Sequence, residues 1–194
     1  MLLTRRNIIT GCGSIVGLAL VGGAGAALDG DAELLRPPGG QDETRFIANC
    51  LRCDRCRSVC PQGCISIARI EDGIVNCRTP YIDFHKGACD FCNKCIDACP
   101  NEALVSFDKD TERIGLAVVD QNECLAFRST GCKVCFEKCP YEAITLEASN
   151  YPVVNESLCN GCGVCENVCP SASFGSYSGS DKRGINVEKK EGSR

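Results

Sequence analysis

Short runs of apolar and β-branched residues recur along the chain after residue 45, and they are the clearest sign of regular structure. Residues 81–84, 116–120 and 152–155 predict three short strands. Residues 65–70 and 74–77 are joined by a glycine-bearing turn, which predicts a β-hairpin. We therefore expect an α+β fold of small β-hairpins and short helices.

The N-terminus has the pattern of an export signal. Arg5 and Arg6 precede a stretch without charge from Asn7 to Leu28, and this stretch ends in small residues around Ala26. A charged start, an apolar middle and a small-residue cleavage site are typical of signal peptides. The adjacent arginines resemble the twin-arginine signal. We expect residues 1–26 to be such a signal, cut or kept as a membrane anchor, with an ordinary Sec signal as the alternative.

Two further segments have little apolar character. Residues 27–45 contain Pro37, Pro38 and three glycines, which predicts an extended linker. Residues 179–194 form a polar tail, and we expect its charged end, Glu188 to Arg194, to be disordered.

The composition indicates that the fold depends on bridges or metal. The 194 residues include 19 cysteines, 20 glycines and 8 prolines, with no Trp, one Met and one His. Large apolar side chains are too few for an ample core, so additional staples are needed. The net charge of -4 comes without a block of basic residues, and we therefore expect no nucleic-acid partner.

The cysteines form four repeats. Three repeats have the spacing Cys-x2-Cys-x2-Cys-x3-Cys-Pro, whereas the third has seven residues in its first gap. The sixteen repeat cysteines are Cys50, Cys53, Cys56 and Cys60; Cys89, Cys92, Cys95 and Cys99; Cys124, Cys132, Cys135 and Cys139; and Cys159, Cys162, Cys165 and Cys169.

This spacing predicts [4Fe–4S] clusters. Three cysteines on a tight loop can hold three corners of a cubane, and in two-cluster ferredoxins the fourth cysteine ligates the other cluster. We expect all sixteen cysteines to be iron ligands of four [4Fe–4S] clusters. The chain would then contain two tandem bacterial 2[4Fe–4S] ferredoxin-like units, at residues 46–110 and 111–178. The sequence leaves the pairing of repeats open, although the short link from Pro140 to Cys159 favours the sequential order.

Zinc and disulfides are the competing interpretations. Structural zinc sites normally use two separated Cys knuckles, and neighbours three residues apart rarely suit a disulfide. Four such motifs in series therefore favour iron and sulfur. The third repeat is the weakest ligand set, because a longer loop must bring in Cys124.

Several residues outside the ligand pattern have simpler interpretations. Cys64 and Cys77 are either small buried thiols, which we favour, or a disulfide formed after export. His85, the single histidine, is expected on a solvated turn. Three phenylalanines between ligands are expected to shield clusters from water: Phe91, Phe127 and Phe136.

Several phrases resemble the ferredoxin-type accessory proteins of periplasmic nitrate reduction. Residues 83–87, 89–92, 124–126 and 160–163 are similar to the NapF type, whereas the twin-arginine start and residues 35–39 look like the NapG/MauM type. The resemblance covers about residues 33–170. An export signal departs from the cytoplasmic NapF type and places the expected location in the periplasm.

This resemblance implies an electron carrier. Electrons would pass from the quinol pool, through a membrane quinol-oxidising protein, to a periplasmic reductase, and the N-terminus could hold the chain at the membrane. The sequence contains no catalytic constellation or phosphate loop, so we expect no enzyme activity. The alternative is a protein that matures or docks a partner molybdenum reductase.

Overall fold

The computed structural model describes residues 33–128, 131–147, 149–171 and 183–189, and the predicted export signal lies outside these ranges. Two compact units are present. The larger comprises Glu33–Ile67 and Thr79–Arg194 and contains all four repeats, and the smaller includes Ala68–Arg78. Within the described ranges, no helix has the length and apolar character needed to cross a membrane.

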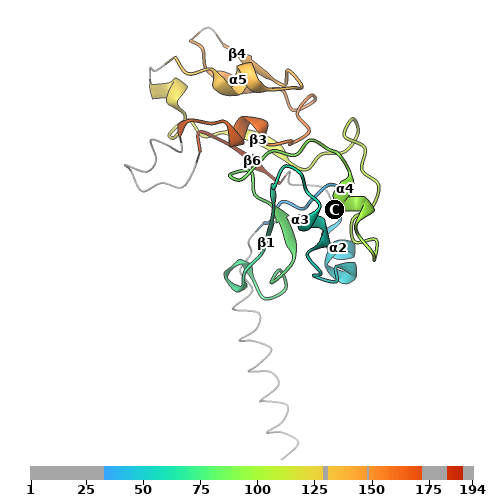
Figure 1. The fold of residues 1–194 in the computed structure, drawn as a ribbon. Coiled ribbons are helices and arrows are strands. Elements are labelled where there is room, and N and C mark those ends of the chain that lie inside the picture. Colours follow the sequence, from blue (N-terminus) through green and yellow to red (C-terminus); the bar gives the residue numbers. More distant parts are fainter. Residues whose placement is uncertain (1–32, 129–130, 148, 172–182, 190–194) are drawn as a thin grey trace, which may run out of the picture. The chain divides into compact units, whose positions relative to one another are not determined.

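One short helix belongs to each repeat (Figure 1). Each of these helices contains the third cysteine of its repeat and ends just before the fourth. The helices are α3 (Arg55–Ser58), α4 (Lys94–Asp97), α5 (Val134–Lys138) and α6 (Val164–Asn167). In the widened gap of the third repeat lies a 3-10 helix, η2 (Leu125–Arg128).

The described residues form three two-stranded antiparallel sheets that connect the repeats. They pair β1 (Ile65–Ile67) with β2 (Pro80–Ile82), β3 (Leu116–Val119) with β6 (Ile185–Glu188), and β4 (Ile144–Leu146) with β5 (Pro152–Val154). Buried apolar residues face each other across the sheets, as in the pairs Ile65–Ile82 and Ala117–Val187. The strands predicted at 81–84, 116–120 and 152–155 are confirmed; the last two are one residue shorter, and the first begins one residue earlier and ends two residues earlier.

The predicted hairpin has the correct first strand and the wrong second strand. β1 pairs with residues 80–82, not with residues 74–77. Ile82 is 4% exposed whereas Val75 is 46% exposed, so pairing with β2 buries more apolar surface. Asp72 accepts a hydrogen bond from the backbone of Arg69 at 2.7 Å, which turns the chain into the 3-10 helix η1 (Ile70–Asp72).

The described part of the expected linker packs against the core instead of running extended over the surface. Arg36 is 3% exposed, stacks 4.7 Å from the Phe46 ring and donates to Thr79 Oγ1 at 2.9 Å. Leu35 accepts a backbone hydrogen bond from Ile82. The following helix, α2 (Glu43–Asn49), begins at the Asp42 cap and buries Phe46. This segment therefore forms one wall of the core.

The expected polar tail contains a strand. Ile185 and Val187 are buried on β6, while the residues between and after them point outward. The Glu166 side chain also accepts a hydrogen bond from the backbone of Val187 at 2.6 Å. The alternation of apolar and polar residues in this strand was visible in the sequence, but the polar residues around it obscured it.

We predict that Ile185→Ala lowers the free energy of unfolding by about 2–5 kcal/mol, because Ile185 is 2% exposed and its removal leaves a cavity. Anaerobic urea unfolding of the cluster-loaded protein measures this change. Glu188→Ala on the exposed end of the same strand is the control and should stay within about 0.5 kcal/mol. Equal effects of the two substitutions would mean that the buried side of β6 does not stabilise the hydrophobic core.

Candidate functional site

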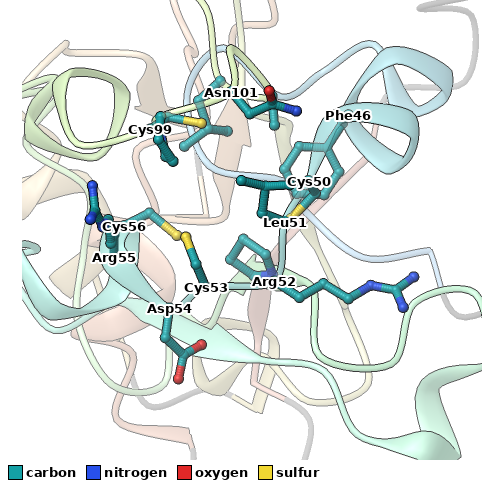
Figure 2. Close-up of a pocket in the computed structure, with 14 residues that line it drawn as sticks. Phe46, Cys50, Leu51, Arg52, Cys53, Asp54, Arg55, Cys56, Cys99 and Asn101 are labelled. Atoms are coloured by element: carbon teal, nitrogen blue, oxygen red, sulfur yellow. The ribbon is translucent and has the colours of Figure 1, made fainter.

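The sixteen repeat cysteines gather into four groups, each with four thiols. The first group lines a cavity with about 380 Å³ of empty space. Cys50, Cys53 and Cys56 come from the first repeat, and Cys99 comes from the end of the second (Figure 2). The side chains of Phe46 and Leu104 form part of the apolar wall of this cavity. We call this the first site.

The second site is the reciprocal of the first. Cys89, Cys92 and Cys95 of the second repeat line a cavity of about 340 Å³ together with Cys60 of the first repeat. Cys64 lines the same cavity, so this site has five thiols around it.

The later two repeats exchange cysteines in the same way. A cavity of about 320 Å³ is lined by the first three cysteines of the fourth repeat and by Cys139 of the third. We call it the fourth site. In the third site, Cys124, Cys132 and Cys169 act electrostatically on the Cys135 thiol, which places the last cysteine of the fourth repeat beside the third. The grouping therefore follows the sequential order of repeats.

The loops around the sites share a backbone conformation. In the first repeat Arg52 and Asp54 have φ of 54° and 64°, and in the second Phe91 and Asn93 have φ of 55° and 59°. The fourth repeat has glycines with the same sign of φ at the corresponding positions. Left-handed backbone costs a non-glycine residue about 1–2 kcal/mol, so its recurrence indicates a conformation imposed by a common task. The left-handed pair coils the loop so that three thiols converge.

The third repeat follows this pattern only in part. Gly131 has φ of 67° at the position of Arg52, but Lys133 has φ of -138° at the position of Asp54. The widened gap is closed by η2, and the backbone N–H of Phe127 donates to the carbonyl of Cys124 at 3.1 Å. The 3-10 helix thereby returns Cys124 to the other thiols of its repeat.

The donor set fits an iron–sulfur cubane. Four thiols and an otherwise mainly apolar lining match a cluster whose irons each take one thiolate. Among the described residues, no group of three or more His, Cys, Asp or Glu side chains could hold a single metal ion. A cubane spaces its four thiolates around a cluster and not around one ion, so these arrangements differ in size.

Burial keeps the apo thiols protonated. It raises the pKa of Cys56 and Cys95 from the ordinary 9.0 to about 12, and that of Cys135 and Cys162 to about 11. Cluster binding needs thiolates, so loading these sites releases protons. Without a cluster, the folded chain holds protons that the unfolded chain has lost above pH 9. The free energy of unfolding of the apo chain therefore decreases, and the apo fold becomes less stable, as pH rises from about 9 towards 12.

We predict that, at pH 9, iodoacetamide alkylates Cys56 and Cys95 at least about tenfold more slowly in the folded apo chain than in the chain unfolded by urea. The reason is that thiolate is the reactive form and burial keeps these thiols protonated. The difference should shrink as pH approaches 12. Peptide mapping by mass spectrometry measures each rate. Identical rates with and without urea at pH 9 would contradict the buried apo thiols.

The aromatic residues near the sites have different roles. Phe91 is 9% exposed, lines the second site and stacks on Phe107 at 5.6 Å, as expected for a shield. Phe127 stacks on Tyr151 at 4.2 Å and is half-buried. The shielding predicted for Phe136 is wrong, because this side chain is 42% exposed on α5.

A buried carboxylate lies next to the fourth site. Glu166 follows Cys165, is 7% exposed, and burial raises its pKa above the usual range. His85 Nε2 lies 3.5 Å from Glu166 Oε1 and is 41% exposed. The histidine is therefore on a solvated turn, as predicted, but it also has an acidic neighbour that the sequence did not reveal.

The sequence did not indicate two features of the sites. The first feature is the left-handed backbone of the loops, because the residue types at these positions do not together predict it. These residues are Arg52, Asp54, Phe91 and Asn93. Cys64 was expected as a small buried thiol, and it is free and 2% exposed, but its place beside the second site was missed. Its spacing of four residues from Cys60 was the available signal. Cys77, in the smaller unit, is also free.

Family models for iron–sulfur proteins match the regions that contain these groups. The "4Fe-4S dicluster domain" matches residues 88–143 and 128–173, and the "4Fe-4S binding domain" matches residues 47–63. Both descriptions agree with the donor chemistry of the four sites.

Curated relatives are ferredoxin-type proteins. The Escherichia coli "Ferredoxin-type protein NapG" is 39% identical over 155 residues, which is 70% of this chain and 65% of the relative's length. The Paracoccus denitrificans "Methylamine utilization ferredoxin-type protein MauM" is 34% identical over 190 residues, covering 86% of this chain and 83% of the relative. The Escherichia coli "Ferredoxin-type protein NapF" is 36% identical over 140 residues, covering 70% and 80%.

Proposed function

This chain belongs to the ferredoxin-type iron–sulfur proteins that include NapG, NapF and MauM, and from this membership we propose that it carries electrons through four [4Fe–4S] clusters. In this proposal the sixteen repeat cysteines are the ligands, grouped as the four sites described above. A bound cluster supplies reversible one-electron redox chemistry, and the chain supplies thiolates, excludes water and orders the sites.

The observation that carries the proposal is a direct connection between the two pairs of repeats. The backbone N–H of Cys89 in the second site donates to the carbonyl of Cys162 in the fourth site at 2.8 Å. The two sites within each pair are also neighbours. The Cys56 thiol raises the pKa of Cys95 electrostatically, and the Cys135 thiol does the same to Cys165. The sites therefore lie in series, in the order first, second, fourth, third.

A series of this kind suits conduction, because electron tunnelling weakens steeply with distance and each site has a near neighbour. The two ends are the first and third sites. Cys53 of the first site is exposed, and the neighbouring Leu51 is 61% exposed, so an electron partner can approach this end. Cys95 and Cys165 are buried at the second and fourth sites, and Cys92 of the second site is exposed, so only part of the middle is protected from water.

In the cell, we place the protein in the periplasm after export by the twin-arginine route, either free or held by its N-terminus. The proposed donor is a quinol-oxidising membrane protein, and the proposed acceptor is a periplasmic reductase of the nitrate-reductase kind. The chain itself acts on no substrate.

The test is reduction of the purified cluster-loaded protein by duroquinol in the presence of membranes from its source. We expect the EPR signals of reduced clusters to appear on the timescale of quinol turnover. Clusters that stay oxidised would overturn the carrier proposal and favour a maturation or docking role. Cys162→Ala is the matched variant, because it removes a proposed ligand of the fourth site. We expect the cluster of the third site then to equilibrate slowly with the clusters of the first and second sites.

A further inference from the structure

The second site contains a thiol that the four-ligand pattern does not use. Cys64 is 2% exposed, and its Sγ lies 3.6 Å from Cys60 Sγ. Cys89 lines the same cavity. Cys64 thus contacts one proposed ligand of the cluster and shares the cavity with a second, one from each repeat of the pair.

The other repeats show what this position normally contains. Four residues after the last cysteine of the second and third repeats are Ala103 and Ala143, which are 3% and 1% exposed. Each lines the cavity served by that last cysteine, as Cys64 does. The equivalent residue of the fourth repeat lies outside the described ranges.

The backbone confirms that these positions are equivalent. The residue just before each one has left-handed φ, which is 64° at Gly63, 51° at Glu102 and 50° at Glu142. Alanine fills the position without difficulty in two repeats, so the turn does not need a thiol in order to fold. The cysteine in the first repeat therefore adds chemistry that the packing does not require.

We propose that Cys64 is a reserve ligand of the second site, able to take over the iron of Cys60. In the exchange, the bond between iron and Cys60 Sγ breaks and a bond between iron and Cys64 Sγ forms. The proton of the Cys64 thiol passes to the departing Cys60 sulfur, so charge and electrons balance and no oxidant is needed. This inference rests on the cluster assignment but not on the direction or partners of electron transfer.

The geometry supports an exchange with little rearrangement. The two sulfurs are already in contact at 3.6 Å, so the exchange requires only a short movement of the Cys64 side chain. A Cβ added at Gly63 would meet nothing within 4 Å, so the turn that joins the two cysteines is open on that side, whereas the Gln62 carbonyl packs closely against Gly87. The β1 end stays fixed, because Asp83 donates a backbone hydrogen bond to the Cys64 carbonyl at 2.8 Å.

The test compares loss of the fourth ligand at two sites of the same cluster-loaded chain. Cys60→Ala removes it where a fifth thiol is present, and Cys99→Ala removes it at the first site, where Ala103 occupies the equivalent position. We expect Cys60→Ala to keep wild-type iron content. We expect Cys99→Ala to lose about one iron per chain and to show a three-iron EPR signal after mild oxidation.

Two further variants keep the proposal falsifiable if one protein folds poorly. Cys60→Ala combined with Cys64→Ala should lose iron as Cys99→Ala does, and Cys99→Ala combined with Ala103→Cys should regain it. Equal iron loss in Cys60→Ala with and without Cys64 would overturn the proposal. If wild-type protein contains no iron and sulfide, the cluster assignment fails instead, so the two failures are distinguishable.

Discussion

Replacing Cys99 and Cys53 together by alanine is expected to remove about four irons per chain, the content of one [4Fe–4S] cluster. Both thiols line the first site although they belong to different repeats. Replacing Cys99 and Cys92 together should remove only about two irons, one from each of two clusters, because these thiols line two different sites. Iron and acid-labile sulfide analysis on anaerobically purified protein measures both values.

The two double variants distinguish crossed from local ligation. If Cys99 served the cluster of its own repeat, the losses would be reversed, with about two irons lost with Cys53 and about four with Cys92. The EPR signals of the third and fourth sites provide the internal control. They should be unchanged in both variants, because neither contains a substitution in repeats three or four.

Gly163→Ala is expected to destabilise the protein and to slow electron exchange between the two pairs of repeats. A Cβ at this position would lie 1.9 Å from the ring of Phe84, which is 2% exposed. Overpacking of this kind costs about 1–3 kcal/mol, and the left-handed φ of 76° adds about 1 kcal/mol. Phe84 and the Cys162 loop must separate to relieve the clash, at the place where the second and fourth sites meet.

Gly131→Ala is the matched control for this prediction. Gly131 has a φ of 67°, but a Cβ there would meet nothing within 4 Å, so only the backbone cost of about 1 kcal/mol applies. Anaerobic thermal unfolding and the rate of electron equilibration after rapid partial reduction measure the two effects. Equal unfolding temperatures for the two variants would contradict the close approach of Gly163 and Phe84.

The local spacing of cysteines predicted much of the site. The short helices expected around the clusters are present in every repeat, where each contains the third cysteine and ends before the fourth. The exchange of fourth cysteines and the sequential order also agree with the expectation from spacing and from the short link before Cys159. These features depend on residues close together in the chain.

The features that depend on distant partners were not predictable in the same way. Arg36 is buried because Thr79 lies 43 positions further along the chain and accepts its hydrogen bond, and no local pattern encodes that distance. Ile185 forms a strand because Val119 is available beside it, while a window around Ile185 contains mostly polar residues. The left-handed conformation of Arg52 and Phe91 is set by the loop around the thiols and not by their side chains.

The exchange of fourth cysteines also determines when each site can be completed during synthesis. The first site has all four thiols once the ribosome has passed Cys99, and the second has its own by the same point. The third site has to wait for Cys169, and β3 remains without its partner strand until residues 185–188 have emerged. Cluster insertion into the later pair is therefore a late event, which follows translation of all four repeats and of the strand that closes the β3 sheet.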